Sequence, residues 1–179
     1  MVTEDHRASG RSAQVVVDSP VGALLLVASG GALTHVWFDG LRRARTDEAQ
    51  VAHEDAEVLA ATTVQLSEYF AGDRREFDLP LQATGTDFQH AVWGQLALIP
   101  WGTTRTYGAI AAALGMPLSA SRAVGSANGA NPLSIIVPCH RVVGADGTLT
   151  GYGGGLPRKS ALLRLEGVPN ERDQLVLFD

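Results

Sequence analysis

The chain has 179 residues, of which 45% are hydrophobic, and a net charge of −5. This length and composition suit one large or two small globular domains, while the acidic charge argues against tight binding to nucleic acid. The single cysteine excludes an internal disulfide and any zinc site that needs several cysteines, and the apolar run 21–28 is too short to span a membrane.

The first half of the chain is predicted to be a small α/β scaffold domain over residues 1–80. Its polar first residues, 1–13, carry no secretory signal and are expected to form a mobile tail. We therefore expect a cytoplasmic protein, in a reducing compartment that keeps a free thiol. Turn signals at residues 19–20 (Ser-Pro) and 30–31 (Gly-Gly) separate short apolar stretches and predict an antiparallel meander. The predicted strands are residues 14–18, 22–28 and 32–38.

A polar loop and a long helix follow the strands. The loop carries three arginines, which are interpreted as solvated: Arg42, Arg43 and Arg45. Residues 49–71 have apolar side chains at helical spacing and are followed by Gly72, which predicts a helix with a glycine stop. This half of the chain shows no constellation of chemically active residues, so we predict that it serves as a scaffold.

The second half, residues 86–179, differs from the first in charge. It holds seven basic and six acidic residues, a net charge of +1, whereas residues 1–85 hold seven arginines and thirteen acidic residues, a net charge of −6. Modest, salt-sensitive contact with DNA phosphates is therefore compatible with this half alone. After a connection over residues 72–85, residues 87–99 predict a helix that Pro100 ends.

A helix-turn-helix pattern comes next. Residues 107–114 predict an alanine-rich helix, residues 115–117 a turn, and Ser119 the cap of a second helix that runs to Asn128. The small side chains of the second helix suit either a shallow fit into a DNA minor groove or tight packing between helices. Arg122 is the one large cation of that helix. Its guanidinium suits three roles: insertion into the base stack of DNA, contact with a phosphate, or a surface salt bridge.

The lone cysteine follows an aliphatic run. Residues 135–137 (Ile-Ile-Val) predict a buried strand that Pro138 ends, so Cys139 is delivered from the end of a rigid element. His140 follows directly, but neighbours on an extended chain point to opposite faces, so its ring need not touch the sulfur. From these residues alone, a buried structural cysteine and a reactive nucleophile both remain open.

A glycine-rich loop and a last helix follow the cysteine. Residues 150–155 lack the spacing of a phosphate-binding loop and are interpreted as bare backbone that lines a pocket, with Tyr152 as an apolar wall. Pro157 starts a helix that runs through Leu165, and Gly167 supplies its stop.

Several of these residues together resemble one protein family. They are Asn131-Pro132, Pro138-Cys139-His140-Arg141-Val142, Gly151-Tyr152, Lys159 and Glu166-Gly167. Over residues 86–167 their identity and spacing resemble the O6-alkylguanine-DNA alkyltransferases, the suicidal DNA repair methyltransferases. The resemblance implies an α/β fold class, with a ribonuclease H-like N-terminal sheet plus helix and a mostly helical, winged-helix/helix-turn-helix domain over residues 86–179.

The resemblance also implies the reaction. The alkyl group of O6-alkylguanine, and of O4-alkylthymine, moves irreversibly from DNA to Cys139, once per chain, without a cofactor or a metal. A monomer holds double-stranded DNA through the minor groove, and the alkylated base is flipped out because a thiol cannot reach it inside the duplex. Glu166 orients His140, which draws the thiol proton through a bridging water and produces the attacking thiolate.

The remaining roles are implied residue by residue. Arg122 fills the gap left by the extruded base, Tyr107 rotates the 3′ phosphate and gives a proton to the base, and Asn131 ties the helix pair to the reactive segment. The small groove-facing residues are Ala123, Ser126 and Ala127. The substrate pocket consists of Tyr152, Gly153, Gly154 and Val142. Without the resemblance, Glu166 is equally a solvated carboxylate at a helix end, and Arg141 is interpreted as structural.

Two other classes of function compete with alkyl transfer. A cysteine hydrolase that uses Cys139, His140 and Glu166 predicts catalytic turnover, but it gives the helix pair no role. A non-enzymatic damage-binding module predicts binding without transfer, and the presence of the cysteine argues against that class. The mass of the intact chain after incubation with alkylated DNA distinguishes the three.

Overall fold

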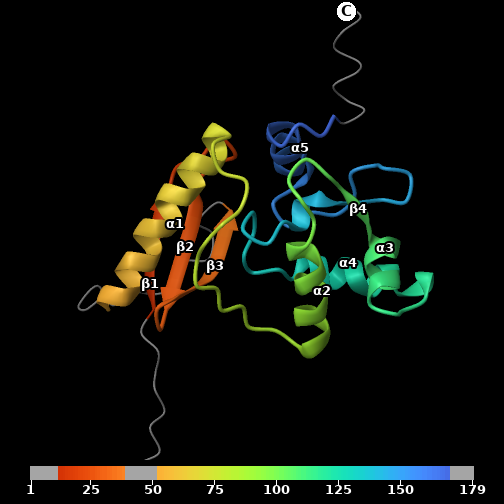
Figure 1. The fold of residues 1–179 in the computed structure, drawn as a ribbon, viewed down its shortest axis with the longest axis horizontal. Helices are drawn as coiled ribbons and strands as arrows, with labels where there is room; N and C mark the ends of the chain where they lie inside the picture. The colour runs from red at the N-terminus through yellow and green to blue at the C-terminus, as the bar shows by residue number, and fades with distance from the viewer. Residues whose placement is uncertain (1–11, 39–51, 170–179) are drawn as a thin grey trace, which may run out of the picture.

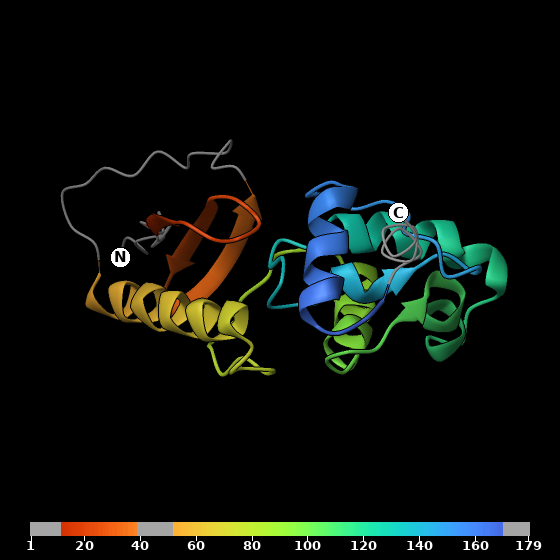
Figure 2. The same cartoon turned by 90° about the horizontal axis from the view of Figure 1, so that it is seen from above.

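The computed structural model describes residues 12–38 and 52–169, which form two lobes side by side (Figure 1, Figure 2). In the described residues, the first lobe is a three-stranded sheet with one long helix, and the second contains four α-helices and a two-stranded sheet. The predicted fold class, a small antiparallel sheet plus helix followed by a mostly helical part, is confirmed. No helix among the described residues is long and apolar enough to cross a membrane.

The sheet of the first lobe forms from three short hydrophobic strands. β1 (Ala13–Val17), β2 (Leu24–Ser29) and β3 (Ala32–Phe38) pair antiparallel in the order β1-β2-β3, which confirms the predicted meander. β2 is the central strand and its apolar residues are buried on both faces. The predicted tail is wrong at Ala13, which pairs with Ala28 and is buried; residues 1–11 lie outside the described residues.

α1 (His53–Ala71) packs along this sheet (Figure 1). Its apolar face buries Val58, Leu59, Leu66 and Tyr69. The helix ends at Gly72, whose φ of 84° lies in the left-handed region that glycine adopts without a steric penalty. The predicted helix is thus confirmed from residue 53 onward. Its predicted start at residue 49 lies outside the described residues, as do Arg42, Arg43 and Arg45.

The connection between the lobes runs along β3. The Leu33 N–H donates to the Pro80 carbonyl at 2.8 Å, and the Gln82 N–H donates to the Leu33 carbonyl at 2.9 Å. Further along β3, the Val36 N–H donates to the Pro132 carbonyl at 2.8 Å. The first lobe is therefore hydrogen-bonded both to the connection and to the segment that leads to the cysteine, and the buried apolar residues of both lobes form one cluster.

The second lobe begins with α2 (Asp87–Ala97), which is two residues shorter than predicted. The Thr86 hydroxyl accepts from the Gln89 N–H, and the Gln89 side chain accepts from the Thr86 N–H, a capping box that fixes the start of the helix. Ile99 follows the helix and is buried.

The helix-turn-helix pair consists of α3 (Tyr107–Ala113) and α4 (Ser121–Gly129), close to the predicted bounds. The Thr106 hydroxyl caps α3 by accepting from the Ala109 N–H at 3.1 Å. The predicted cap at Ser119 is wrong, because this residue lies within a 3-10 turn, Leu118–Ala120, that precedes α4.

The segment before the cysteine is a turn, and the predicted strand over residues 135–137 is wrong. Ile135 has a φ of 74°, and the Val137 N–H donates back to the Leu133 carbonyl at 2.9 Å. All three aliphatic side chains are buried. A buried turn and a buried strand share this apolar signature, so the sequence pattern could not separate them.

The lobe is completed by a short parallel pairing and a last helix. β5 (Val142–Val143) pairs with β4 (Arg105–Thr106), which brings the residues after the cysteine beside the start of α3. α5 (Leu156–Leu165) follows, with Pro157 in its first turn as predicted. Its C-terminal end returns the chain to the cysteine segment, and this return positions the site.

Candidate active site

Glu166, at the end of α5, is the centre of a buried hydrogen-bond network. Its Oε1 accepts from His140 Nε2 at 2.9 Å, from the Tyr69 hydroxyl at 2.7 Å and from Arg141 Nη2 at 2.9 Å. Its Oε2 accepts from Arg141 Nε at 2.7 Å. Glu166 is 3% exposed, so it is not a solvated carboxylate at a helix end.

The network fixes the charge and the tautomer of His140. Burial alone would raise the pKa of Glu166, but hydrogen bonds from His140 and Arg141 lower it to about 2, so the carboxylate is ionised at neutral pH. A carboxylate only accepts, so His140 Nε2 carries the ring proton. Nδ1 is buried and has no hydrogen-bond partner within the described residues. Burial also lowers the pKa of His140, which leaves a neutral ring with a basic Nδ1.

The thiol of Cys139 needs such a base. Burial raises the pKa of Cys139, and a hydrogen bond from Asn131 and the charge of Lys159 offset part of that shift. The resting thiol is therefore protonated at neutral pH, and its nucleophilic form must be generated. Residues Cys139–Arg141 form a 3-10 turn rather than an extended strand, so the objection that Cys139 and His140 face opposite sides does not apply.

Two asparagines hold the reactive turn against α4. Asn131 Nδ2 donates to the Val137 carbonyl at 2.8 Å, and its Oδ1 accepts from the Leu133 N–H at 3.0 Å. Asn128, at the end of α4, donates to the Cys139 carbonyl at 3.4 Å. The left-handed turn is thus braced on both sides, and Asn131 lies where the sequence placed the link between the helix pair and the cysteine.

A lysine and two tyrosines shape the loop after β5. Lys159 is buried, its Nζ donates to the Thr150 carbonyl at 2.7 Å, and burial lowers its pKa to about 8. The Tyr107 hydroxyl, from α3, donates to the same carbonyl at 3.2 Å. Burial, followed by the charge of Cys139, raises the pKa of Tyr152, whose buried hydroxyl has no hydrogen-bond partner within the described residues.

Two of the other predicted pocket residues, Gly153 and Gly154, directly follow Tyr152 in the chain. A Cβ at Gly154 would lie 2.7 Å from the Phe38 ring, so only glycine lets the loop approach β3 this closely. Gly153 is exposed, and Val142, the first residue of β5 after the cysteine turn, is fully buried. Within the described residues, no three His, Cys, Asp or Glu side chains gather to hold a metal ion.

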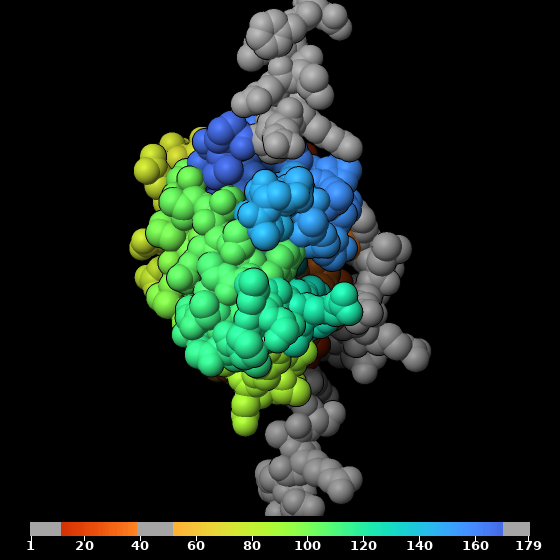
Figure 3. All heavy atoms as spheres, turned by 90° about the vertical axis from the view of Figure 1, so that its right-hand side faces the viewer, coloured from red at the N-terminus to blue at the C-terminus, as the bar shows by residue number. Residues whose placement is uncertain are grey.

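The outer face of α4 carries the predicted groove residues. Arg122, Ala123 and Ser126 are exposed on it. Figure 3 shows the second lobe from its far end, with the helix pair in green and teal below the light-blue loop that follows β5. The DNA contact predicted for Ala127 is wrong, because Ala127 is 3% exposed and its carbonyl accepts from Trp93 Nε1 at 2.9 Å.

Tyr69 is a site residue that the sequence analysis missed. It belongs to α1, in the lobe interpreted as scaffold, and lies 97 residues before Glu166 in the chain. Its ring packs against three aromatic side chains, namely Phe70, Phe77 and Trp101. The available signal was a tyrosine on the buried face of a helix, whose hydroxyl needs a partner inside the protein.

We expect Tyr69→Phe to slow proton transfer from Cys139 about tenfold, because Glu166 loses one of the hydrogen bonds that hold its carboxylate in place against His140, while the ring is kept. With one donor fewer, Glu166 stabilises protonated His140 more, so the acid limb of the pH–rate profile should move to higher pH. Phe70→Leu, which alters ring packing alone, is the matched control. An unchanged pH profile in Tyr69→Phe would contradict a role in the network.

Comparisons with known proteins cover both lobes. The model of the "6-O-methylguanine DNA methyltransferase, ribonuclease-like domain" matches residues 14–83, and that of the "6-O-methylguanine DNA methyltransferase, DNA binding domain" matches residues 87–168. The methylated-DNA–protein-cysteine methyltransferase of Mycobacterium tuberculosis is 50% identical over 91% of this chain and 96% of its own length. The protein of the same name from Methanosarcina acetivorans is 48% identical over 85% of this chain and 96% of its own length.

Solved structures agree with these sequence comparisons. The crystal structure of Mycobacterium tuberculosis OGT in complex with DNA superposes with a TM-score of 0.75 at 47% identity, covering 93% of this chain and 99% of that chain. The crystal structure of the Mycobacterium tuberculosis O6-methylguanine methyltransferase superposes with a TM-score of 0.72 at 45% identity, covering 94% of this chain and 99% of that chain.

Proposed function

This chain belongs to the 6-O-methylguanine DNA methyltransferase family, and on this premise we propose that Cys139 accepts an alkyl group from O6-alkylguanine in DNA. The protein repairs DNA by transferring the alkyl group to a cysteine, and Cys139 is the only cysteine of the chain. The observation that carries the assignment is the buried Glu166–His140 pair next to this thiol, with one ring nitrogen left to accept a proton.

The reaction proceeds in one displacement. Nδ1 of His140 takes the thiol proton, through a bridging water, while Glu166 holds the imidazolium that forms. The Cys139 sulfur attacks the alkyl carbon, the S–C bond forms, and the C–O6 bond breaks with its electron pair leaving on guanine. The Tyr107 hydroxyl supplies a proton to the departing base. The thioether product has no displaceable group, so each chain reacts once, and no cofactor takes part.

Double-stranded DNA is bound through its minor groove, against the exposed face of α4. Small side chains there, Ala123 and Ser126, allow close approach of the backbone but read little sequence. The damaged nucleotide flips into the space bounded by Tyr152, Gly153, Gly154 and Val142, because the thiol is buried and the duplex hides the alkyl carbon. The protein acts as a monomer in the cytoplasm. O4-alkylthymine is a second substrate, because it presents the same kind of alkyl–oxygen bond to the sulfur.

The direct test is the mass of the intact chain after mixing with a short duplex that carries O6-methylguanine. We expect one gain of about 14 Da per chain, with no further turnover when DNA is in excess. Binding without a mass change would favour a damage-binding module. Repeated turnover with an unchanged chain would favour a hydrolase, and either result would contradict the proposal.

Arg122 is proposed to fill the gap left by the flipped base. We expect Arg122→Ala to slow transfer from duplex DNA at least about tenfold, because the cost of unstacking, a few kcal/mol, is no longer offset. Transfer from the free base O6-methylguanine should be unchanged, since no flipping is needed there. Arg74→Ala, which removes one cation from the first lobe, is the matched control. Equal loss on both substrates would contradict the assignment.

A further inference from the structure

An apolar groove of about 700 Å³ lies between the loop that follows α2 and the turn that precedes Cys139. Leu98 and Trp101 belong to the loop, Ile136 and Val137 belong to the turn, and Leu81 comes from the connection between the lobes. Leu98 is 67% exposed and Leu81 is 45% exposed. Large apolar side chains that are exposed around one groove mark a surface that another apolar group covers.

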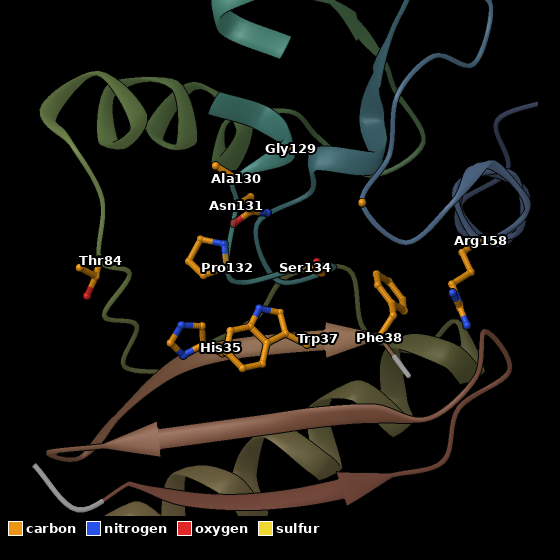
Figure 4. Close-up of a pocket in the computed structure, with 11 residues that line it drawn as sticks. His35, Trp37, Phe38, Thr84, Gly129, Ala130, Asn131, Pro132, Ser134 and Arg158 are labelled. Atoms are coloured by element: carbon orange, nitrogen blue, oxygen red, sulfur yellow. The ribbon is translucent and has the colours of Figure 1, made fainter. Parts of the chain in front are cut away.

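A second cavity, of about 600 Å³, lies between β3 and the residues that follow α4 (Figure 4). Its lining includes five polar or charged side chains, which are His35, Thr84, Asn131, Ser134 and Arg158. In the apolar groove, by contrast, most lining residues are apolar. Because unpaired polar groups are costly to cover with apolar ones, the apolar groove is the better site for a cluster of apolar side chains.

The sequence of residues 170–179, which lie outside the described residues, contains such a cluster. Leu175, Val176, Leu177 and Phe178 are four consecutive apolar residues in a stretch that is otherwise polar. A run of this length is unfavourable in water unless it packs against another surface. The volume of the groove lies within the range of about 300–1,000 Å³ that is typical of sites for compact ligands, so it can receive a few apolar side chains.

The last described residues bring the chain to the rim of the apolar groove. The Glu166 carboxylate binds Arg141, which lines the groove, at 2.7 Å. The Glu166 carbonyl oxygen lies 3.1 Å from where a Cβ of Gly102 would be, in the loop that supplies one wall. Pro169 is the last described residue, and Leu175 follows it by six positions. Six extended residues span up to about 20 Å, which is enough for the apolar run to reach the groove.

Charges at the rim of the groove suit the same segment. Arg75 and Glu76 line the groove and both are exposed. The Arg75 guanidinium lies 6.0 Å from the centre of the Trp101 ring, so its charge is close to the apolar wall. Arg172 and Asp173 precede the apolar run, so each rim charge finds an opposite charge in the segment.

We propose that Leu175–Phe178 docks in the apolar groove of its own chain, where it covers Leu98 and Trp101. The docked segment holds the loop after α2 against the turn that precedes Cys139, and it buries the apolar side chains that the two lobes leave exposed there. This docking goes beyond the proposed function, because it needs no alkyl transfer and is tested without DNA.

The first test is a double-mutant cycle in the whole chain. Phe178→Ser and Leu98→Ser are each expected to lower the melting temperature by about 3 °C, because each removes one side of the same apolar contact. The double variant should lose little more than either single variant. Val64→Ser, at an exposed position of α1, is the matched control, and its effect should add to that of Phe178→Ser. Fully additive losses for Phe178→Ser and Leu98→Ser, or no loss in Phe178→Ser, would overturn the inference.

The second test identifies what occupies the groove. Leu98→Cys and Phe178→Cys are combined in a Cys139→Ser chain, which is then oxidised with glutathione disulfide. We expect a disulfide within one chain, formed at least about tenfold faster than in the matched chain that carries Val64→Cys and Phe178→Cys, because docking raises the effective concentration of the two thiols. Peptide mapping of the monomer by mass spectrometry measures the link. A disulfide between two chains would assign the groove to a second copy, and equal rates in both chains would mean that the segment has no preferred site. Either result contradicts the proposal.

Discussion

Cys139→Ala should accept no methyl group from DNA, with a transfer rate at least about 1,000-fold below that of the wild-type chain. The chain has no second thiol, and Lys159, the nearest amine that the structure links to the site, is engaged with the Thr150 carbonyl. The duplex should still bind within about twofold, because the groove-facing side chains of α4 are untouched. Intact-mass spectrometry measures the transfer, and a gel-shift titration at fixed salt measures binding.

Cys139→Ser is the matched control for this result. It keeps the size and polarity of the side chain but replaces the thiol with a hydroxyl, which is a far weaker nucleophile at neutral pH. Alkyl transfer to Cys139→Ser should also be undetectable on the same timescale. The free energy of unfolding of this variant should differ from that of wild type by only about 1 kcal/mol. A mass gain in Cys139→Ala would identify another acceptor and contradict the assignment of the nucleophile.

Glu166→Gln is expected to affect stability and chemistry together. It removes the negative charge opposite the buried Arg141 guanidinium, and loss of one partner of a buried ion pair costs about 3 kcal/mol. It also removes the group that stabilises protonated His140, so alkyl transfer should slow at least about 100-fold. Chemical denaturation and single-turnover kinetics measure the two effects separately.

A surface ion pair provides the control for that substitution. Glu68 binds Arg74 at 2.6 Å, but the two side chains are 42% and 29% exposed. Glu68→Gln should therefore cost less than about 1 kcal/mol and leave transfer unchanged. If Glu166→Gln were no more destabilising than Glu68→Gln, Glu166 would not be the ionic centre of the site.

Much of the fold was predictable because it is encoded locally. The three strands, the helix that ends at Gly72 and the helix pair each carry a pattern within a window of about 20 residues. The site could be predicted in part for another reason: Cys139 and His140 are adjacent in the chain, and their neighbours resemble a known family. Glu166 came from the same resemblance rather than from periodicity or spacing.

The remaining features depend on tertiary contacts that no local pattern records. Ile135 adopts a left-handed conformation, which a β-branched residue rarely does, and hydrogen bonds from Asn131 brace that turn. Tyr69 reaches Glu166 across the interface between the lobes. Ala127 is as small as the exposed residues of α4, but it is buried and its carbonyl accepts from Trp93, and side-chain size does not reveal which way a helix is rotated.

The hydrogen bond from Val36 to Pro132 changes how the chain can be divided. Sequence similarity separates the chain near residue 85 into two parts, each matched by its own family model. Pro132, in the segment that leads to Cys139, nevertheless accepts a backbone hydrogen bond from Val36. Glu166 likewise accepts a hydrogen bond from the Tyr69 hydroxyl. Both donors lie before that boundary. The second part expressed alone would contain the whole sequence motif but lack part of the framework that shapes it. The part of the chain that repair requires is thus larger than the part that matches the DNA-binding family model alone.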